Sequence, residues 1–341
     1  MKSRDIIFLS LFSVIILFFG IGILVLPRQS FSQKENRILT TAATLSFESL
    51  LSGEYFEQIS ELCSDQFPMR DGFTAIYALS ELSLGKSEVN GVVFSGNVLA
   101  ARSKNMKSSS DALRKAKELF GEDSYVYIPP SSIQVFSQLL PQSLQSEIAS
   151  QPSAFLPSDY YKTDHHWTTE GAYIAYTKIC GEFGISAFGE EYFEKETVAK
   201  DFRGSAYARS CLPDQLISPD KITLYRYEGD EDVEIFRRDT STQEFGFYDE
   251  SALLGADKYR VFLGGNYAQL SIKSDQSKPR LVLVKDSFAN SVIPFLSLHF
   301  NIEVIDPRYC TQSELLDLAD EYSSERILIL MSEATLIECF N

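Results

Sequence analysis

Residues 161–173, YKTDHHWTTEGAY, place two of the chain's three histidines side by side, between an aspartate and the single tryptophan. An aspartate two residues before a histidine can orient and polarise its imidazole. In an extended segment side chains alternate, so Asp164 and His166 would share one side and His165 would point the other way. The spacing therefore favours Asp164 and His166 as an acid–base pair, with His165 as the alternative base.

Ser287 lies in LVLVKDSFANS, directly after an apolar run typical of a buried strand and before a stretch of helical character. A serine in that position meets the free backbone N–H groups of a helix start, which stabilise the negative charge developed during nucleophilic attack. A serine there is also a common N-cap with no further role. Together with Asp164 and His166, however, Ser287 becomes the candidate nucleophile of a Ser-His-Asp arrangement.

Two other interpretations of the histidine pair stay open. Asp164, His165 and His166 are all metal-ligand types, but adjacent histidines in an extended segment diverge and no third spaced ligand is evident. Alternatively, both histidines are hydrogen-bonded parts of a packed loop beside Trp167. Neither a metal nor an organic cofactor is predicted.

An acyl-transfer site needs two or more hydrogen-bond donors about 3 Å from the developing oxyanion. The backbone N–H of Ser287 is one candidate. Gly264, Gly265 and Asn266, in the turn predicted after a strand over 259–263, are the second, because glycine lets backbone approach closely and the asparagine amide donates. Arg308, after the apolar run NIEVID, is a candidate donor to an ester carbonyl or a sugar carboxylate.

Apolar runs alternate with helical stretches in the C-terminal third, which predicts an α/β fold with a parallel sheet flanked by helices. The runs are RLVLVK, NIEVID and RILILM, and the stretches between them are 289–300 and 311–322. Ligands of such sheets gather beyond the carboxyl ends of the strands, where Ser287 lies. Further towards the N-terminus we expect a hairpin turning at 95–97 and a short strand over 125–128.

The N-terminal region predicts a membrane anchor. Residues 6–26 carry no charge, and as a helix rising about 1.5 Å per residue they span the roughly 30 Å hydrocarbon core. No small-x-small cleavage pattern follows, so we expect an uncleaved signal anchor after a cytoplasmic tail, 1–5. A juxtamembrane linker, 27–45, would lead to one extracytoplasmic domain, 46–341, with the more polar segment 188–251 as an insertion.

The composition limits the class of partner. Against 47 Asp and Glu stand 31 Lys and Arg, a formal net charge of −16 with no basic stripe, which excludes a nucleic-acid surface. Five widely spaced cysteines show no CxxC or zinc pattern, and most of them are expected to be buried small apolar residues. The acidic charge favours a neutral glycan over an anionic polymer.

The segment TDHHWTTEGA resembles the signature of the DHHW family. Other segments similar to that family's pattern extend the resemblance over nearly everything after the predicted anchor: ENRIL, DQFPMRDGF, VNGVVFSGNVL, FRGSAYARS, FLGGNYAQLSI, LVLVKDSFANSVIPFLSLHF and VIDPRYC. The family is itself similar to SGNH/GDSL hydrolases and to the extracytoplasmic O-acetyltransferases that modify alginate. The resemblance thus implies an SGNH-like domain whose triad falls on Ser287, His166 and Asp164.

The order of these residues favours acetyl transfer. Asp and His precede the serine, as in the alginate acetyltransferases, and one residue separates them instead of the two in the common hydrolase pattern. Lys285 stands where many relatives have glycine. The resemblance implies an O-acetyltransferase or O-acetylesterase of a cell-surface or secreted polysaccharide, with a membrane acyltransferase supplying acetyl groups. The alternatives are a non-catalytic envelope assembly or glycan-binding protein and a metal-dependent hydrolase at the histidine pair.

Overall fold

A computed structural model describes residues 3–102, 109–145 and 154–341 of the chain. The fold separates into two compact units. Unit 1 comprises Met1–Lys86 and Ser210–Pro213, and unit 2 comprises Ser87–Arg209 and Asp214–Asn341. Every predicted site residue lies in unit 2.

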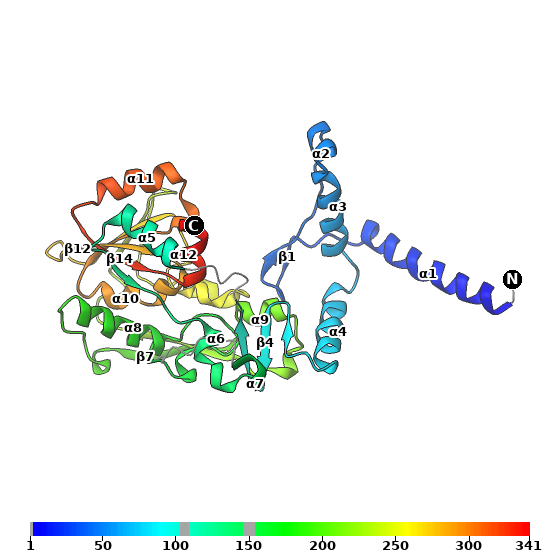
Figure 1. Cartoon of the computed structure of the whole chain (residues 1–341), viewed down its shortest axis with the longest axis horizontal. Helices are drawn as coiled ribbons and strands as arrows, with labels where there is room; N and C mark the ends of the chain where they lie inside the picture. The colour runs from blue at the N-terminus through cyan, green and yellow to red at the C-terminus, as the bar shows by residue number, and fades with distance from the viewer. Residues whose placement is uncertain (1–2, 103–108, 146–153) are drawn as a thin grey trace. The chain divides into compact units, whose positions relative to one another are not determined.

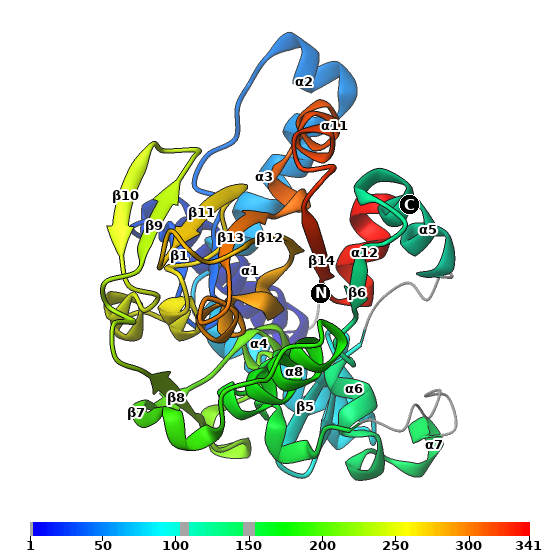
Figure 2. The ribbon, with the colours of Figure 1, turned by 90° about the vertical axis from the view of Figure 1, so that its left-hand side faces the viewer.

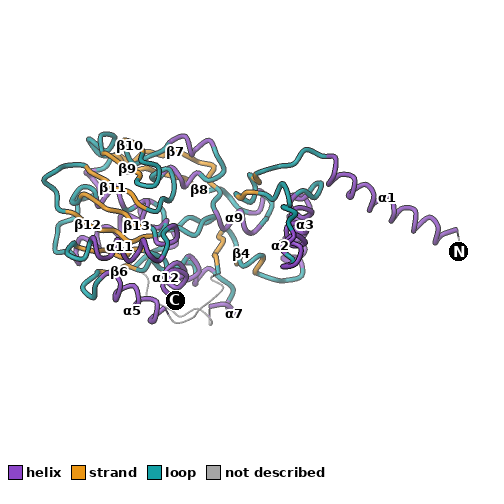
Figure 3. Tube along the Cα trace, turned by 90° about the horizontal axis from the view of Figure 1, so that it is seen from above, coloured by secondary structure: helices purple, strands orange, loops and turns teal. Residues whose placement is uncertain are grey.

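Unit 1 is built of helices and loops apart from one short hairpin, β1 with β2 (Figure 3). The first helix, α1, is apolar and long enough to cross a membrane, which agrees with the predicted anchor in length and composition. The proline-containing segment after Asp65 separates two later helices, as a residue without a backbone N–H would. The elements of unit 1 are α1 (Ser3–Val25), β1 (Phe31–Ser32), β2 (Arg37–Ile38), α2 (Phe47–Ser52), α3 (Glu54–Asp65) and α4 (Arg70–Ser83).

Unit 2 is organised around a seven-stranded sheet with the order β10-β9-β11-β13-β12-β14-β6, which Figure 2 shows from β10 to β6. The strands are β6 (Tyr125–Tyr127), β9 (Glu234–Arg237), β10 (Thr242–Phe245), β11 (Gln269–Lys273), β12 (Arg280–Lys285), β13 (Asn301–Ile305) and β14 (Arg326–Leu330). The three apolar runs of the C-terminal third form β12, β13 and β14, as predicted.

The sheet is mixed, which corrects the expectation of a parallel sheet. Strands β13, β12, β14 and β6 are parallel, whereas β11 pairs antiparallel with β13, and β9 and β10 extend that edge antiparallel. The antiparallel strands are short and only half apolar. In β11, for example, Leu270 and Ile272 alternate with polar neighbours, the pattern of a strand with one buried face.

Helices cover both faces of the parallel part of the sheet (Figure 1). Alternate residues of β12 separate the two apolar clusters: Leu281 and Leu283 pack with α8 and α10, and Val282 and Val284 pack with α5, α11 and α12. These helices are α5 (Ser109–Phe120), α8 (Thr169–Glu182), α10 (Ile293–Leu296), α11 (Gln312–Glu321) and α12 (Glu333–Phe340). The result is a three-layer α/β/α core.

Several local predictions differ from the structure. The hairpin turning at 95–97 is present between β4 (Val92–Ser95) and β5 (Val98–Ala101), but residues 259–263 form no strand. Their first part is a 3-10 helix, Lys258–Val261, and Leu263 has a positive φ of 63°. The first crossover stretch is a 3-10 helix, Ser287–Ser291, followed by the single-turn helix α10.

The polar segment 188–251 contributes β7 (Glu194–Phe202) and β8 (Asp220–Arg226), which pair antiparallel as a ribbon, and also supplies β9 and β10 of the main sheet. The remaining elements of unit 2 are a three-stranded antiparallel sheet and short helices: β3 (Glu88–Val89), β4 (Val92–Ser95), β5 (Val98–Ala101), α6 (Ser132–Val135), α7 (Gln142–Gln145) and α9 (Ser205–Ser210).

Candidate active site

Ser287 lies beyond the carboxyl end of strand β12, between β13 and β14 in the sheet, as its sequence position after an apolar run predicts. Asp286 is the N-cap, and its Oδ1 accepts a hydrogen bond from Phe288 N at 3.0 Å. Its Oδ2 accepts from Ser332 N at 2.8 Å, which ties the turn to the end of the neighbouring strand β14. The N-cap function thus belongs to Asp286, and the Ser287 hydroxyl is left for another role.

The DHHW segment is a tight loop, not an extended strand. Tyr160 and Trp167 pair as an isolated antiparallel bridge, so the loop closes on itself. Thr168 then caps α8, accepting from Gly171 N at 3.3 Å, and the Trp167 indole donates to the carbonyl of Phe288 at 3.1 Å. The indole therefore fastens the loop to the turn that carries Ser287.

The loop brings the three predicted triad residues together. His166 Nε2 lies 2.7 Å from Ser287 Oγ, and His166 Nδ1 lies 2.5 Å from Asp164 Oδ1. Asp164 and His166 are buried, whereas Ser287 is partly exposed. This geometry lets the carboxylate hold the imidazole while the second ring nitrogen accepts the hydroxyl proton.

Asp164 is held as a carboxylate. Burial alone would raise its pKa, but the imidazoles of His166 and His165 and hydrogen bonds to the carboxylate lower the pKa well below its usual range. One of these bonds comes from the backbone N–H of Ser205, which donates to Asp164 Oδ2 at 2.6 Å. The role of Ser205 was not predictable from the sequence, because 41 residues separate it from Asp164.

Gly204 fits directly against the same carboxylate. A Cβ atom added at this glycine would lie 2.2 Å from Asp164 Oδ2, closer than any real contact between such atoms. Residues 204 and 205 belong to FRGSAYARS, one of the segments similar to the DHHW family pattern. In the sequence, the glycine within this segment is the feature that could have indicated a close approach of the backbone to another group.

We expect Gly204→Ala to lower the turnover of an acyl ester by about 100-fold, because the new methyl group must displace the Asp164 carboxylate and misalign the triad. Turnover with saturating p-nitrophenyl acetate measures the effect. Gly181→Ala is the matched control, since a Cβ at Gly181 meets nothing within 4 Å and should leave turnover unchanged. Equal activity of both variants would contradict this account of Gly204.

Aromatic rings enclose the His166 imidazole. Tyr259 stacks on it with ring centroids 4.0 Å apart and planes 5° from parallel, and Phe288 approaches edge-on at 4.9 Å. The Tyr259 hydroxyl donates to the Ser287 carbonyl at 3.3 Å. Tyr259, in the stretch wrongly predicted as a strand, therefore holds both the His166 ring and the turn that carries Ser287.

His165 is not the partner of Ser287. Its ring lies 3.8 Å from that of His166, so the two side chains do not diverge as alternation along a strand predicts. Its Nδ1 forms a hydrogen bond with Ser205 Oγ at 2.5 Å. Desolvation and the neighbouring imidazole lower the His165 pKa, so this ring is neutral at pH 7.

Lys285, which stands just before the nucleophile turn, is completely buried and ionically paired. Its Nζ lies 3.3 Å from Asp306 Oδ2 and donates to Asn266 Oδ1 at 2.9 Å and to Asn290 Oδ1 at 2.8 Å. Burial lowers the Lys285 pKa, which Asp306 counteracts. The predicted Arg308 also pairs with Asp306, donating from Nε and from the terminal nitrogen at 2.9 and 2.6 Å.

The Lys285 contact fixes the orientation of Asn266. Because Lys285 and Asn290 both donate to Asn266 Oδ1, the amide nitrogen must point elsewhere. Among the described residues, none accepts a hydrogen bond from that nitrogen or from the backbone N–H of Ser287. Gly264 and Gly265 both adopt positive φ, 70° and 130°. This backbone conformation favours glycine at both positions, independently of any role as hydrogen-bond donors.

A metal at the histidine pair would compete with existing hydrogen bonds. Ligand atoms of Asp164, His165 and His166 lie within 4.8 Å of one another. Both ring nitrogens of His166 and the Nδ1 of His165 already have partners, namely Asp164, Ser287 and Ser205. The contacts of His166 therefore match an acid–base residue better than a metal ligand.

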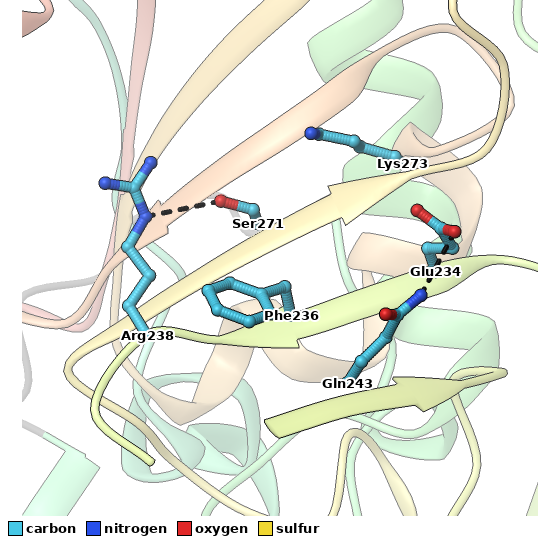
Figure 4. A pocket seen from close by; sticks show the side chains of 6 residues that line it. All are labelled: Glu234, Phe236, Arg238, Gln243, Ser271 and Lys273. Carbon is cyan, nitrogen blue, oxygen red and sulfur yellow. Dashed lines mark hydrogen bonds between the residues drawn. The ribbon is translucent and has the colours of Figure 1, made fainter. Parts of the chain in front are cut away.

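A hollow of about 590 Å³ lies elsewhere, over the edge strands β9, β10 and β11 (Figure 4). Arg238 donates there to Ser271, and Gln243 to Glu234. None of the predicted site residues lines it. Its lining residues are Glu234, Phe236, Arg238, Gln243, Ser271 and Lys273.

Residues 153–305 match a protein-family model described as DHHW protein. The chain carries a DHHW family domain. This DHHW domain includes Asp164, His166, Ser205, Tyr259 and Ser287. The comparison with curated protein sequences gives no match.

Solved structures share the fold of the DHHW domain and its surroundings. A DHHW family protein from Eubacterium siraeum has a TM-score of 0.57 at 19% identity, over 73% of this chain and 93% of that one. Bacillus cereus PatB1, solved with a sulfonyl adduct, has a TM-score of 0.54 at 16% identity, over 72% and 95%. The O-acetyltransferase domain of Pseudomonas putida AlgJ matches with a TM-score of 0.40 at 14% identity, over 72% and 92%. At these identities, the likeness to the Eubacterium siraeum protein and to PatB1, whose TM-scores exceed 0.5, concerns the fold alone.

Proposed function

We propose that the chain is a Ser-His-Asp acyl-ester enzyme, an O-acetyltransferase or O-acetylesterase of a cell-surface or secreted polysaccharide, anchored by α1 with unit 2 outside the cytoplasm. The hydrogen-bonded chain from Asp164 through His166 to Ser287 Oγ carries the proposal. His166 and Ser287 are 121 residues apart in the sequence, and Asp286 already caps the helix start, so capping does not account for the contact of Ser287 with His166.

The reaction begins when Ser287 Oγ attacks the acyl carbonyl and passes its proton to His166 Nε2. The negative charge of Asp164 stabilises the imidazolium that results. Collapse of the tetrahedral intermediate transfers that proton to the departing alcohol and leaves Ser287 acylated. A sugar hydroxyl or water then attacks the acyl group, loses its proton to His166 and releases Ser287.

We assign the oxyanion site to two hydrogen-bond donors that have no acceptor among the described residues. The Ser287 N–H and the Asn266 amide nitrogen lack acceptors among the described residues, and the second is oriented by the buried Lys285. Arg308 is committed to Asp306 through two hydrogen bonds, and 24% of its side chain is exposed. A contact of Arg308 with a substrate carboxylate or ester would come from that exposed part.

The acyl group and the acceptor are inferred from the resemblance of the sequence and from the solved structures, whereas the nucleophile is inferred from the geometry of the site. The resemblance of the sequence to acetyltransferases favours acetyl. The PatB1 structure contains a sulfonyl adduct, the kind of product formed when an activated nucleophile attacks a sulfonyl reagent. If transfer is the reaction, an acetyl donor must reach the site, and a membrane acyltransferase is the partner that the resemblance implies.

The test is incubation of the full chain in detergent with p-nitrophenyl acetate, followed by intact mass. We expect an acetyl adduct and turnover in the wild type and neither in Ser287→Ala. Ser332→Ala is the matched control, because Ser332 also follows a strand and its hydroxyl caps α12, while the backbone N–H that it donates to Asp286 is kept in the variant. It should lose about 1 kcal/mol of stability and keep its activity.

Added sugars then separate transfer from hydrolysis, since an acceptor raises turnover only if it takes the acyl group from Ser287. A chelator should change nothing, and inhibition by it would favour the metal-dependent hydrolase. Equal behaviour of wild type and Ser287→Ala would overturn the enzyme proposal and favour a non-catalytic glycan-binding or assembly protein.

A further inference from the structure

Unit 1 presents an apolar stripe along α4. Met69, Phe73, Ile76, Tyr77 and Leu84 lie at spacings of three, four and seven or eight residues, which places them on one face of the helix. Their exposed fractions range from 44% for Phe73 to 75% for Leu84. A stripe of this kind on a helix marks a surface that another apolar phase covers.

The stripe is continuous with the apolar helix α1. The Phe19 ring of α1 contacts Phe73 edge-on at 5.7 Å and stacks with Phe67 at 4.9 Å. At Gly22 the two segments approach so closely that an added Cβ would lie 2.6 Å from Pro68. The face of α4 that carries Phe73 is therefore the face turned to α1.

The positions of these contacts along α1 give their depth. Phe19 precedes the end of α1 at Val25 by six residues and Gly22 by three, which is about 9 Å and about 5 Å at 1.5 Å per residue. With α1 across a bilayer, Phe67, Pro68 and Phe73 lie that far inside the end of the span. Helices that lie in the membrane interface bury their apolar face by roughly 5–10 Å.

The direction of α4 fits the same arrangement. In Figure 1, α3 and α4 run across the direction of α1, as helices lying along a membrane surface would when α1 spans it. The charged groups beside the stripe are paired with each other: Arg70 binds Glu35, Arg37 binds Asp65, and Lys86 binds Glu81. The stripe itself carries no charge.

We propose that the apolar stripe of α4 inserts into the lipid surface beside α1, so that unit 1 lies on the membrane as an interfacial platform. The occupant is the acyl-chain and headgroup boundary of the bilayer. Because the stripe lacks charge, its insertion depends on apolar burial and needs no anionic lipid. The proposal depends on insertion of α1 and is independent of the chemistry of unit 2.

The test places the photoreactive residue p-benzoylphenylalanine at Ile76 or Tyr77 of the full chain, reconstituted in phosphatidylcholine vesicles. After irradiation, we expect protein carrying the mass of one lipid. The same residue at Asp71, on the opposite face of α4 and with 59% of its side chain exposed, should give no lipid adduct. Because the replaced residues are exposed, the fold should stay intact. Two positions in the stripe are used so that inefficient crosslinking at one of them does not decide the result.

A label at Phe12 of α1 reports whether the anchor is inserted. A second outcome is that Phe12 labels lipid while Ile76 or Tyr77 labels a second copy of the chain or unit 2. The stripe would then contact protein and not the bilayer, which would overturn the proposal. Absence of lipid adducts at Phe12 would overturn it at its first step. Equal lipid labelling at Asp71 would show that α4 is not oriented.

Discussion

Replacement of Asp164 by asparagine is expected to lower the turnover of an acyl ester by about four orders of magnitude, the effect of the equivalent change in serine proteases. Asp164 Oδ1 accepts from both the ring and the backbone N–H of His166, and Oδ2 accepts from Ser205 N. An asparagine has only one acceptor oxygen, so one of these groups must face an amide N–H. If that group is the imidazole, the tautomer that can deprotonate Ser287 is lost.

The measurement is kcat with p-nitrophenyl acetate, with Trp167 fluorescence as the check on folding. Asp159→Asn is the matched control, because this buried aspartate precedes the same loop and its carboxylate accepts from Leu156 N, away from His166. Its turnover should stay within a few-fold of wild type. A fall of equal size in both variants would assign Asp164 a role in loop structure instead of catalysis.

The proximity of Asp164, His166 and Ser287 was predictable from sequence, although not for the expected geometric reason. Ser287 followed from its position after an apolar strand, and Asp164 with His166 from their spacing. The pair does not result from alternation along an extended segment, because the loop is closed by the Tyr160–Trp167 bridge and both histidine rings lie together. Periodicity describes regular elements, and this loop is set by tertiary contacts.

The residues that support the triad were not predictable in the same way. Ser205 and Tyr259 reach it from distant segments, and the 3-10 helix that carries Tyr259 has a strand-like sequence. The antiparallel edge of the sheet was missed for a similar reason, since β9 and β10 are short and lie in a polar segment. Contacts with the rest of the fold, such as the pairing of β10 with β9 and of β9 with β11, decide these elements, and the local sequence pattern does not reveal them.

The Lys285–Asp306 pair could have been found from sequence. Parallel pairing of β12 with β13 puts Val284 opposite Ile305, so the next residues of both strands meet at the carboxyl edge of the sheet. RLVLVK and NIEVID each end in a charge at that register. Opposite charges at matching ends of adjacent parallel strands are thus a usable signal for a buried ion pair beneath a site.

That pair carries the largest expected effect on stability. We expect Asp306→Asn to lower the free energy of unfolding of unit 2 by about 3–5 kcal/mol at pH 7, because it leaves the Lys285 ammonium buried without a counterion. Both side chains are 0% exposed, so water cannot solvate the charge that remains. The urea midpoint followed by fluorescence of Trp167, the single tryptophan, measures this unit because Trp167 lies in its core.

The pH dependence identifies the cause. Burial already lowers the Lys285 pKa, and loss of Asp306 lowers it further, so the unfolded chain binds more protons than the folded one. The unfolding free energy of the variant therefore rises, relative to wild type, as pH increases from 7 towards 10. Asp306→Asn combined with Lys285→Met should recover part of the loss at pH 7, because no ammonium is then buried. A loss independent of pH, with no recovery in the double variant, would trace the effect to packing or to Arg308 instead of to the lysine.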